Sequence, residues 1–319
     1  MCSACPDRSD PKTASGQRER LARGEILTSL DPDLIPGMSE ERTKTMQNGH
    51  ADASGLNVIV PLFVPAHRPD RFEKAAAAEP DAVILDLEDA VPLEAKDSAR
   101  AQLRRDFTSL PVLVRVNAAG TEFHAADLEA AARLRPNGVI LPKSESVQTL
   151  DAVAAILGPD IPILALVESA RGLAQARVIA AHPAVARLAF GSVDFSADIG
   201  CAHVREALLA ARSELVLAAR LAGGLAPLDG VTTAILDPTR ARADALYARD
   251  LGFTGKLAIH PGQIRPIREG FQPGEAEIAW AHQVLASGDG AVAVDGAMVD
   301  EPIRIRARTI LTRAAAGGA

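Results

Sequence analysis

The sequence predicts an α/β fold, a TIM (β/α)₈ barrel followed by a C-terminal helical extension or lid. From Asn57 onward, short runs of β-branched and other apolar residues alternate with Ala-rich stretches of helical length, which is typical of repeated βα units. Eight such runs are present, and eight is the number of strands in this barrel. Polar residues follow most of the runs directly, as expected where all strands converge on one mouth.

The length and composition of the chain are compatible with this fold. The 319 residues suit one barrel with an added tail, and 48% hydrophobic with 24% charged residues allows a sizeable core. The formal net charge of −7 gives the molecule no general attraction for nucleic acid or anionic lipid. No apolar run reaches about 18 residues, and no secretory signal pattern is present. We therefore expect a cytoplasmic protein with no nucleic-acid or membrane partner.

The first 55 residues are expected to form a flexible extension. They are rich in Ser, Asp, Arg, Glu, Gly and Pro, and they show no lasting hydrophobic period apart from a weak helical pattern over Gln17–Ser29. Cys2 and Cys5 form a CxxC pair with no second pair to complete a zinc site. This favours a solvated tail over a zinc or redox role. Together with Cys201, these cysteines are too few for a disulfide framework.

The apolar runs predict the strands, and the stretches between them predict helices long enough for right-handed crossovers. The predicted strands are Val58–Val64, Ala82–Leu87, Val112–Val116, Gly138–Leu141, Ile161–Val167, Arg187–Phe190, Gly230–Leu236 and Lys256–Ile259. The predicted helices include Pro69–Ala78, Ala95–Asp106, Val147–Leu157 and Glu206–Ala222.

The residues after the eighth unit predict an appendage that a barrel does not need. A helix is expected near Glu275–Ala286, then a segment with turn-forming Gly and Asp over Ala291–Asp300, then an Arg-rich helix from Pro302. We therefore expect three parts, a flexible extension over 1–55, the barrel over 56–273, and a lid or oligomerisation segment over 274–319.

Polar side chains stand at the carboxyl ends of the predicted strands. Because these ends meet at one mouth, the pattern indicates an active site there. Capping of the following helix is an alternative use of such residues, and for Asp237 and Lys143 it is as good an explanation. The strand-end residues are Asp86, Glu88, Asp89, Arg115, Asn117, Lys143, Glu168, Asp194, Asp237 and His260.

Glu168 and Asp194 are the candidate metal ligands. They belong to adjacent βα units and should project from strands about 4.8 Å apart, close enough to share one hard cation. A site with oxygen ligands and no nearby cysteine or paired histidine favours Mg²⁺, with Mn²⁺ as a substitute. The alternative is that Glu168 forms a buried ion pair with Arg171 or Arg115.

Arg115 is the candidate substrate-binding cation. It ends the strand Val112–Val116, where an unpaired guanidinium would be costly to bury, and its planar fork suits a carboxylate or a developing oxyanion. Asp86, Glu88 and Asp89 place three acids within four residues, which need compensating charge. We expect at least one of them to orient Arg115 or to hold a metal-bound water.

The motifs occur in the order found in a known family. The chain resembles the citrate lyase β-subunit-like branch of the HpcH/HpaI aldolase superfamily, which includes malyl-CoA and citramalyl-CoA lyases. The resemblance extends from about Pro61 to the C-terminus. The segments that carry it are Leu62–Pro69, Val83–Val91, Val114–Asn117, Leu141–Lys143, Val167–Gly172, Gly191–Asp194, Gly252–Lys256 and Ile259–Gln263.

The resemblance implies roles for particular residues. It implies a TIM barrel in which Glu168 and Asp194 bind Mg²⁺ and Arg115 contacts substrate. It further implies homotrimers or homohexamers in which the segment Gly296–Asp300 supplies a catalytic aspartate, Asp300, to a neighbouring active site. Val193 departs from the family, because many relatives carry an acid before the metal-binding aspartate.

The thioester loop of the family matches a loop near the eighth predicted strand. Lys256, His260 and Gln263 lie on or beside it, although His260 before Pro261 could equally be a structural loop cap.

Together, these features predict a Mg²⁺-dependent carbon–carbon lyase acting on a 3-hydroxyacyl thioester such as malyl-CoA, citramalyl-CoA or a citryl thioester. Arg115 would stabilise negative charge, and Asp300 would donate the proton to the thioester enolate. The alternatives are a class II aldolase acting on 4-hydroxy-2-oxo acids, and a non-catalytic acyl-CoA-binding subunit of a lyase complex. The acid fragment and the thioester carrier, CoA or an acyl-carrier protein, stay open.

Overall fold

The computed structural model describes residues 56–288, 292–294 and 297–317. The predicted flexible extension, the weak helix over Gln17–Ser29 and the Cys2–Cys5 pair lie outside the described residues.

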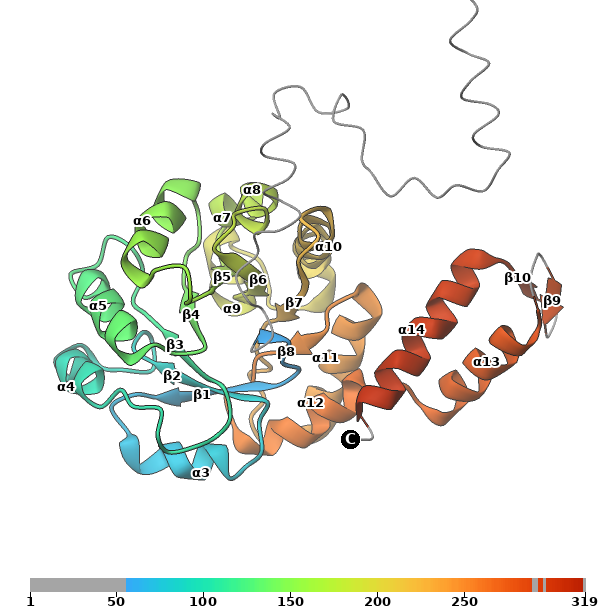
Figure 1. The fold of residues 1–319 in the computed structure, drawn as a ribbon, viewed down its shortest axis with the longest axis horizontal. Coiled ribbons are helices and arrows are strands. Elements are labelled where there is room, and N and C mark those ends of the chain that lie inside the picture. Colours follow the sequence, from blue (N-terminus) through green and yellow to red (C-terminus); the bar gives the residue numbers. More distant parts are fainter. Residues whose placement is uncertain (1–55, 289–291, 295–296, 318–319) are drawn as a thin grey trace, which may run out of the picture. The chain divides into compact units, whose positions relative to one another are not determined.

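Eight parallel strands pair in chain order from β1 to β8 and form the predicted barrel (Figure 1). Lys256 donates its backbone N–H to the carbonyl of Ile59, and Phe63 donates to the carbonyl of Ala258, so the last strand also pairs with the first. Leu62 bridges Ala258 in the same parallel sense. The strands are β1 (Pro61–Pro65), β2 (Ala82–Asp86), β3 (Val112–Arg115), β4 (Gly138–Leu141), β5 (Ile163–Val167), β6 (Val185–Phe190), β7 (Leu225–Asp229) and β8 (Gly255–Lys256).

The helices that connect the strands lie outside them (Figure 1). Val147–Leu157 is a helix with the predicted bounds, and Ser146 caps it by accepting a hydrogen bond from the backbone N–H of Thr149. The connecting helices are η3 (Pro69–Arg71), α3 (Phe72–Ala76), η4 (Leu93–Ala95), α4 (Lys96–Ala101), α5 (His124–Leu134), α6 (Val147–Leu157), α7 (Ala170–Ala174), α8 (Ala176–Ala180), α9 (Ser192–Ile199), α10 (Arg205–Leu221), α11 (Pro238–Leu251), η5 (Pro261–Gln263) and α12 (Ile264–Phe271). None of the described helices is both long and apolar enough to cross a membrane.

The prediction of the seventh strand was wrong. The run Gly230–Leu236 lies in the loop after β7, where Leu236 is 88% exposed, and the strand itself is Leu225–Asp229. Pro227 interrupts that strand's apolar run, and proline is disfavoured inside a sheet, so the segment did not look like a strand. The pairing of β6 with β7 is irregular between Arg187 and Ala189, so this part of the sheet departs from a regular ladder.

Two apolar layers give the barrel its core. Within β2, Ile84 belongs to one buried cluster while Val83 and Leu85 belong to the other, as the alternation of side chains along a strand requires. The smaller cluster also contains Leu164 of β5 and Leu228 of β7. The helices pack on the larger cluster.

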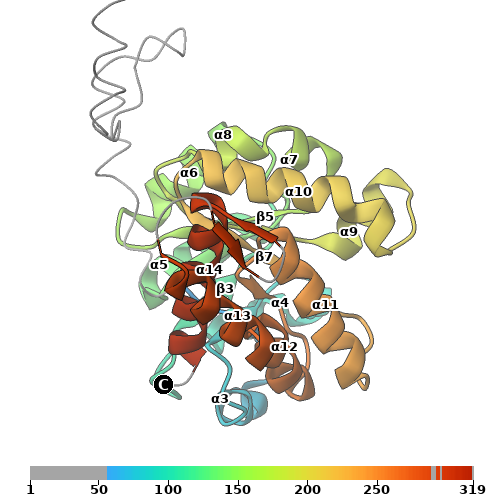
Figure 2. The ribbon, with the colours of Figure 1, turned by 90° about the vertical axis from the view of Figure 1, so that its right-hand side faces the viewer.

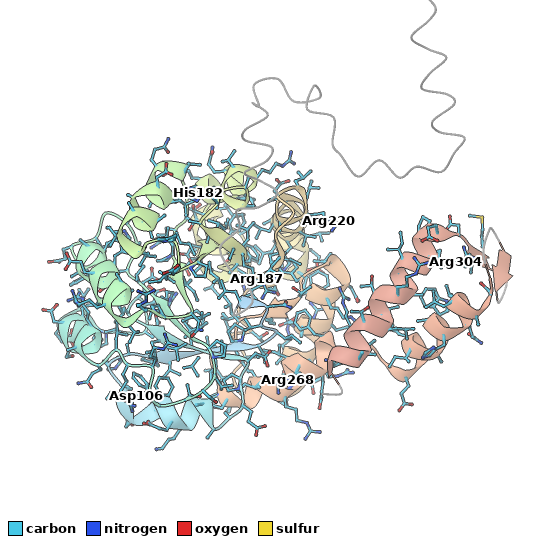
Figure 3. The ribbon with its side chains drawn as sticks, viewed as in Figure 1. Asp106, His182, Arg187, Arg220, Arg268 and Arg304 are labelled. Carbon is cyan, nitrogen blue, oxygen red and sulfur yellow. The ribbon has the colours of Figure 1, made fainter. Side chains whose placement is uncertain are left out.

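Arg187 of β6 is a buried cation within the fold, labelled among the strands in Figure 3. Its Nη1 donates to the carbonyls of Leu56 and Val58 at 2.7 and 2.8 Å. Its Nε donates to the carbonyl of Ala226, and its Nη2 donates to Thr254 Oγ1. Burial lowers the pKa of Arg187 to about 9. Backbone oxygens thus provide most of its contacts.

The C-terminal extension consists of α13 (Glu275–Ala286), β9 (Val292–Val294), β10 (Ala297–Val299) and α14 (Glu301–Gly317). Helices α13 and α14 lie side by side, with the antiparallel pair β9–β10 between them in the chain (Figures 1 and 2). The predicted turn segment over Ala291–Asp300 thus contains the two paired strands β9 and β10. The extension has an apolar cluster of its own, which includes Ala281, Val284 and Ala307.

Candidate active site

Strands β2 and β3 bring Asp86 and Arg115 together, because the two residues are partners in the strand register. Arg115 Nε lies 2.7 Å from Asp86 Oδ1, and Arg115 Nη2 lies 2.7 Å from Asp86 Oδ2, which makes a bidentate pair. Asp86 is buried and also accepts hydrogen bonds from the backbone N–H groups of Glu88 and Ala90. Asp86 is therefore the acid of the predicted trio that orients Arg115.

The third nitrogen of the Arg115 guanidinium contacts the other two acids. Nη1 lies 2.9 Å from Glu88 Oε2 and 3.4 Å from Asp89 Oδ2, and the ring of Phe63 lies 4.7 Å from the guanidinium carbon. Burial opposes the charge of Arg115, but Asp86 and the other carboxylates outweigh burial and raise its pKa. Arg115 is therefore a cation at neutral pH.

Glu88 is a buried carboxyl whose proton is held unusually firmly. Burial raises its pKa to about 8, Arg115 lowers it, and the charges of Asp89, Glu168 and Asp86 raise it further. Among the described residues, Glu88 Oε2 accepts no hydrogen bond, so its contact with Arg115 is an ion pair without hydrogen-bond geometry. Near neutral pH, Glu88 can therefore hold a proton.

Lys96 supports these strand ends and was not predicted from the sequence. Its Nζ donates to the carbonyls of Leu87 and Glu88 at 2.7 and 2.8 Å, and to Asn117 Oδ1 at 2.7 Å. Asn117 in turn donates to Asp127 and to the carbonyl of Leu87, so it has a positioning role. A lysine in a predicted helix is usually exposed, so the sequence carries no signal for this burial.

Glu168 follows β5 and is held by backbone. Its Oε1 accepts a 2.8 Å hydrogen bond from the backbone N–H of Lys143, which has a left-handed φ of 46° and an exposed side chain. Gly191 leaves room for this carboxylate, because a Cβ there would lie 2.4 Å from both Cβ and Oε2 of Glu168. Thus Lys143 acts through its backbone, and the glycine, which the sequence reasoning missed, is a steric requirement.

The negative charge of ionised Glu168 has little positive charge near it to balance it. Burial raises its pKa to about 7, the Lys143 hydrogen bond lowers it, and the charge of Asp194 raises it. Asp194 lies exposed in the first turn of α9, near enough for its charge to act on Glu168. Two interacting carboxylates, one of them buried, fit a hard divalent cation such as Mg²⁺.

The alternative prediction for Glu168 was an ion pair with a neighbouring arginine. Within the described part of the chain no such pair forms, since Arg171 contacts Glu145 at 3.7 Å and Arg115 pairs with Asp86, Glu88 and Asp89. No group of three or more His, Cys, Asp or Glu that could hold a metal occurs among the described residues, so a metal there would rely on water or substrate for its other ligands.

A second buried polar cluster lies at the ends of β7 and β8. Asp229 Oδ1 accepts from Arg212 Nε at 2.8 Å, and Asp229 Oδ2 accepts from Lys256 Nζ at 3.0 Å. Lys256 also donates to the carbonyl of Gly230. Burial opposes the charge of Asp229, but Lys256 and Arg212 outweigh it and lower the pKa. Asp229 was not predicted as a site residue, because the seventh strand was predicted over Gly230–Leu236, directly after the true strand that Asp229 ends.

The predicted thioester contact of Lys256 and Gln263 does not fit their surroundings. Each side chain is only about 1% exposed. Gln263 donates to the carbonyl of Thr232 at 2.7 Å and accepts from the backbone N–H of Ile259 at 3.1 Å. Both residues therefore hold loops in place, and a direct ligand contact would require these bonds to break.

Three further predicted site residues serve as caps. His260 Nδ1 accepts from the backbone N–H of Gly262, and Asp237 accepts from that of Arg240. Asp300 Oδ1 accepts from the backbone N–H of Ile303 at 3.4 Å in the first turn of α14. Asp237 therefore caps α11, and the cap that His260 forms leaves its predicted position beside the thioester untested. Asp300 caps α14 of its own chain, and this contact does not test its predicted role as a proton donor in a neighbouring subunit.

The second cluster also abuts the helix that carries Asp194. A Cβ at Gly230 would lie 2.2 Å from Ser192 Oγ, and Ser192 is the first residue of α9. Ser192 Oγ lies 2.9 Å from His203 Nε2. The start of α9 is therefore held between the buried β7 end and His203.

Comparison with known proteins agrees with the motif order. The family described as HpcH/HpaI aldolase/citrate lyase matches residues 60–261. A citrate lyase subunit beta-like protein of Deinococcus radiodurans is 42% identical over 277 residues, covering 80% of this chain and 96% of the relative. A (3S)-malyl-CoA thioesterase of Cereibacter sphaeroides is 37% identical over 269 residues, covering 80% and 94%.

A solved structure has the same fold. The CitE protein of Mycobacterium tuberculosis, in complex with magnesium, acetoacetate and coenzyme A, superposes with a TM-score of 0.74 at 40% identity. The match covers 81% of this chain and 98% of that one.

Proposed function

Because the chain belongs to the HpcH/HpaI aldolase/citrate lyase family, we propose that it is a Mg²⁺-dependent lyase that breaks a carbon–carbon bond of a 3-hydroxyacyl thioester. The observation that carries this proposal is the meeting, at one barrel mouth, of a fixed cation and coupled carboxylates. Arg115 is held by Asp86, while the charge of Asp194 acts on buried Glu168 and that of Glu168 acts on Glu88. Substrates of this class include malyl-CoA, citramalyl-CoA and citryl thioesters.

Glu168 and Asp194 are the proposed ligands of Mg²⁺. The space kept open by Gly191 and the uncompensated charge of Glu168 support this assignment, as does the magnesium in the similar CitE structure. Bound there, the ion would polarise the hydroxyl or carbonyl oxygen of the acid fragment and hold its carboxylate.

Arg115 is proposed to stabilise the negative charge that develops when the carbon–carbon bond breaks. Two of its nitrogens are fixed by Asp86, and Nη1 makes the contact with exposed Asp89, which supports Nη1 as the nitrogen that faces substrate. A guanidinium oriented beforehand stabilises charge without reorganising during the reaction. Asp86 acts through Arg115 as a positioning residue, and Glu88 is the nearby carboxyl able to exchange a proton near neutral pH.

The reaction needs one proton removed and one delivered. Loss of the substrate's hydroxyl proton lets the C–C electron pair move into the thioester fragment, which leaves an enolate, while the other fragment gains a carbonyl. The enolate carbon then takes a proton. Asp300 of a neighbouring copy in a homotrimer or homohexamer is the proposed donor. The loop held by Lys256 and Gln263 and capped by His260 is proposed to border the thioester, carried by CoA or an acyl-carrier protein.

Thioester hydrolysis is the second candidate, because several relatives of similar identity are named (3S)-malyl-CoA thioesterase. The two reactions release different products. A lyase yields a 2-oxo acid and a shorter acyl thioester in equal amounts, whereas a hydrolase yields a free thiol and no oxo acid.

The test is to incubate the protein and Mg²⁺ with malyl-, citramalyl- and citryl-CoA and with a 4-hydroxy-2-oxo acid. Formation of glyoxylate, pyruvate or oxaloacetate without free thiol would support the proposal. Thiol release alone would favour the hydrolase, and cleavage of the hydroxy-oxo acid alone would favour an aldolase. No product from any substrate would favour a non-catalytic binding subunit. Glu168→Gln should abolish turnover, while Glu129→Gln, at an exposed position of α5, should not.

A further inference from the structure

A small polar cavity lies where α10, α11, β7 and β8 meet, and Figure 1 shows these four elements as neighbours. We propose that it binds one small monovalent anion of about the size of chloride. Arg205 and Arg212 of α10 and Arg240 of α11 line it, together with Asp229, Asp244 and Lys256. The proposal does not depend on the reaction that the barrel catalyses.

Two guanidinium nitrogens at this cavity lack an acceptor. Arg212 Nη1 and Arg205 Nε are both buried, and neither has a hydrogen-bond partner among the described residues. The Arg212 side chain is 8% exposed, so bulk water does not solvate its free N–H groups. A buried N–H without an acceptor is unfavourable, and two of them lining one cavity indicate a ligand that accepts hydrogen bonds.

The carboxylates near the cavity are already engaged. Asp229 binds Arg212 and Lys256 through its two oxygens. Asp244 accepts from Arg205 at 2.8 Å, from Thr232 at 3.0 Å and from Arg240 at 3.2 Å. All four of these carboxylate oxygens already have partners, and none of them accepts a hydrogen bond from Arg205 Nε or Arg212 Nη1.

The cavity also carries an excess of positive charge. Four cationic side chains line it against two carboxylates, and no other carboxylate is among the residues that line it. Burial and the charges of Arg212 and Lys256 lower the pKa of His203, which keeps it neutral. The guanidinium carbons of Arg205 and Arg212 lie 4.8 and 5.8 Å from the centre of the Tyr247 ring. A water could accept hydrogen bonds here, but only an anion also offsets the charge.

The size of the cavity defines the class of ligand. Its volume of about 20 Å³ is enough for one water or one halide ion. A phosphate, a sulfate or a thioester substrate is too large. The ligand is therefore a monatomic or similarly small anion, bound between the two free guanidinium nitrogens.

Anomalous diffraction from crystals grown in sodium bromide tests the proposal directly. We expect a bromide peak within hydrogen-bond distance of Arg205 Nε and Arg212 Nη1. A cavity that contains only water density while bromide peaks occur at surface sites would overturn the proposal.

Thermal unfolding of the full chain provides a second test in solution. At constant ionic strength, replacing gluconate, which is too large for the cavity, with chloride or bromide should raise the Tm of the wild type. Arg205→Gln should lose most of that rise. Arg177→Gln is the matched control, because it removes an arginine that pairs with Glu214 away from the cavity. An equal halide response in all three proteins would contradict the proposal, as would a halide effect seen only at molar concentrations.

Discussion

Glu168 and Glu88 are two buried carboxyls that hold protons near neutral pH, with pKa values raised by burial to about 7 and about 8 from an ordinary 4.5. Because the unfolded chain ionises them near 4.5, the stability they contribute is fully present below that pH. It is lost progressively as the pH rises from about 4.5 through the folded pKa values of about 7 and about 8. A bound divalent cation would relieve this penalty, since it favours the ionised form.

Magnesium binding should therefore strengthen with pH. We expect the affinity measured by titration calorimetry to rise about fivefold between pH 6 and pH 7, as a proton is displaced from Glu168, whose pKa is about 7. It should level off above pH 8. The Tm increase caused by Mg²⁺ should likewise be larger at pH 8 than at pH 6. A pH-independent affinity across this range would show that Glu168 is not a ligand.

The bidentate contact between the Arg115 guanidinium and Asp86 predicts that lysine, whose charge is a single point, cannot replace Arg115. Arg115→Lys keeps the charge but loses the bidentate contact with Asp86, and it leaves that buried acid with an incomplete partner. We expect kcat/KM to fall on the order of 10²-fold with the fold retained by circular dichroism.

Arg104→Lys is the control for this change. Arg104 also contacts two acids, Glu73 and Asp106, but on the exposed surface. If Arg115→Lys were no worse than this control, Arg115 would have a structural role only.

At the scale of elements, local sequence patterns predicted most of the strands and helices of the barrel. They did not predict the side-chain contacts between elements. The motif around Glu168 lies within one strand and its turn, so sequence alone was sufficient to mark it. The burial of Lys256 and Gln263 depends on β7 and the loop after it, and the misplaced seventh strand removed Asp229 from consideration. Lys256 and Gln263 therefore make hydrogen bonds to an acid and to carbonyls that another element brings in, and these contacts could not be predicted from the local sequence.

The close approach of Gly230, directly after β7, to Ser192 of α9 predicts that Gly230 cannot be replaced without a cost in stability. Gly230→Ala would force a Cβ against Ser192 Oγ at the start of α9, the helix that carries Asp194. We expect a loss of about 1–3 kcal/mol in unfolding free energy and weaker Mg²⁺ binding than in the wild type.

Gly224→Ala is the matched control, since the nearest atom to its new Cβ is 4.0 Å away. It should change neither quantity by much. Unaltered Mg²⁺ affinity in Gly230→Ala, despite lower stability, would show that this contact supports the fold without positioning Asp194.

At the scale of the whole molecule, the C-terminal extension raises the question of which barrel Asp300 serves. In its own chain Asp300 caps α14, and Asn caps as well as Asp does. If Asp300 is only a cap, Asp300→Asn will keep nearly full activity. If Asp300 donates the proton, the same variant should lose on the order of 10²-fold in kcat.

Subunit mixing tests the proposed role in a neighbouring subunit. Inactive Asp300→Asn and inactive Glu168→Gln proteins are combined under conditions that allow exchange. Recovered activity requires sites in which one subunit provides Glu168 and another provides Asp300. With exchange verified by mass, a mixture that stays inactive would rule out shared sites.

The hydrogen bonds of Arg187 have a consequence for the order in which the chain can fold. The donor to the carbonyl of Leu56 is Arg187, which lies 131 residues further along the chain. The second strand that pairs with β1 comes later still, at Ala258. While the ribosome is still making the second half of the barrel, β1 therefore has an unpaired edge, the kind of surface that invites pairing with another chain. Protection of its amides from hydrogen exchange should appear late in synthesis, after β8 has left the ribosome. The first strand of the barrel is thus among the last to gain both of its neighbours.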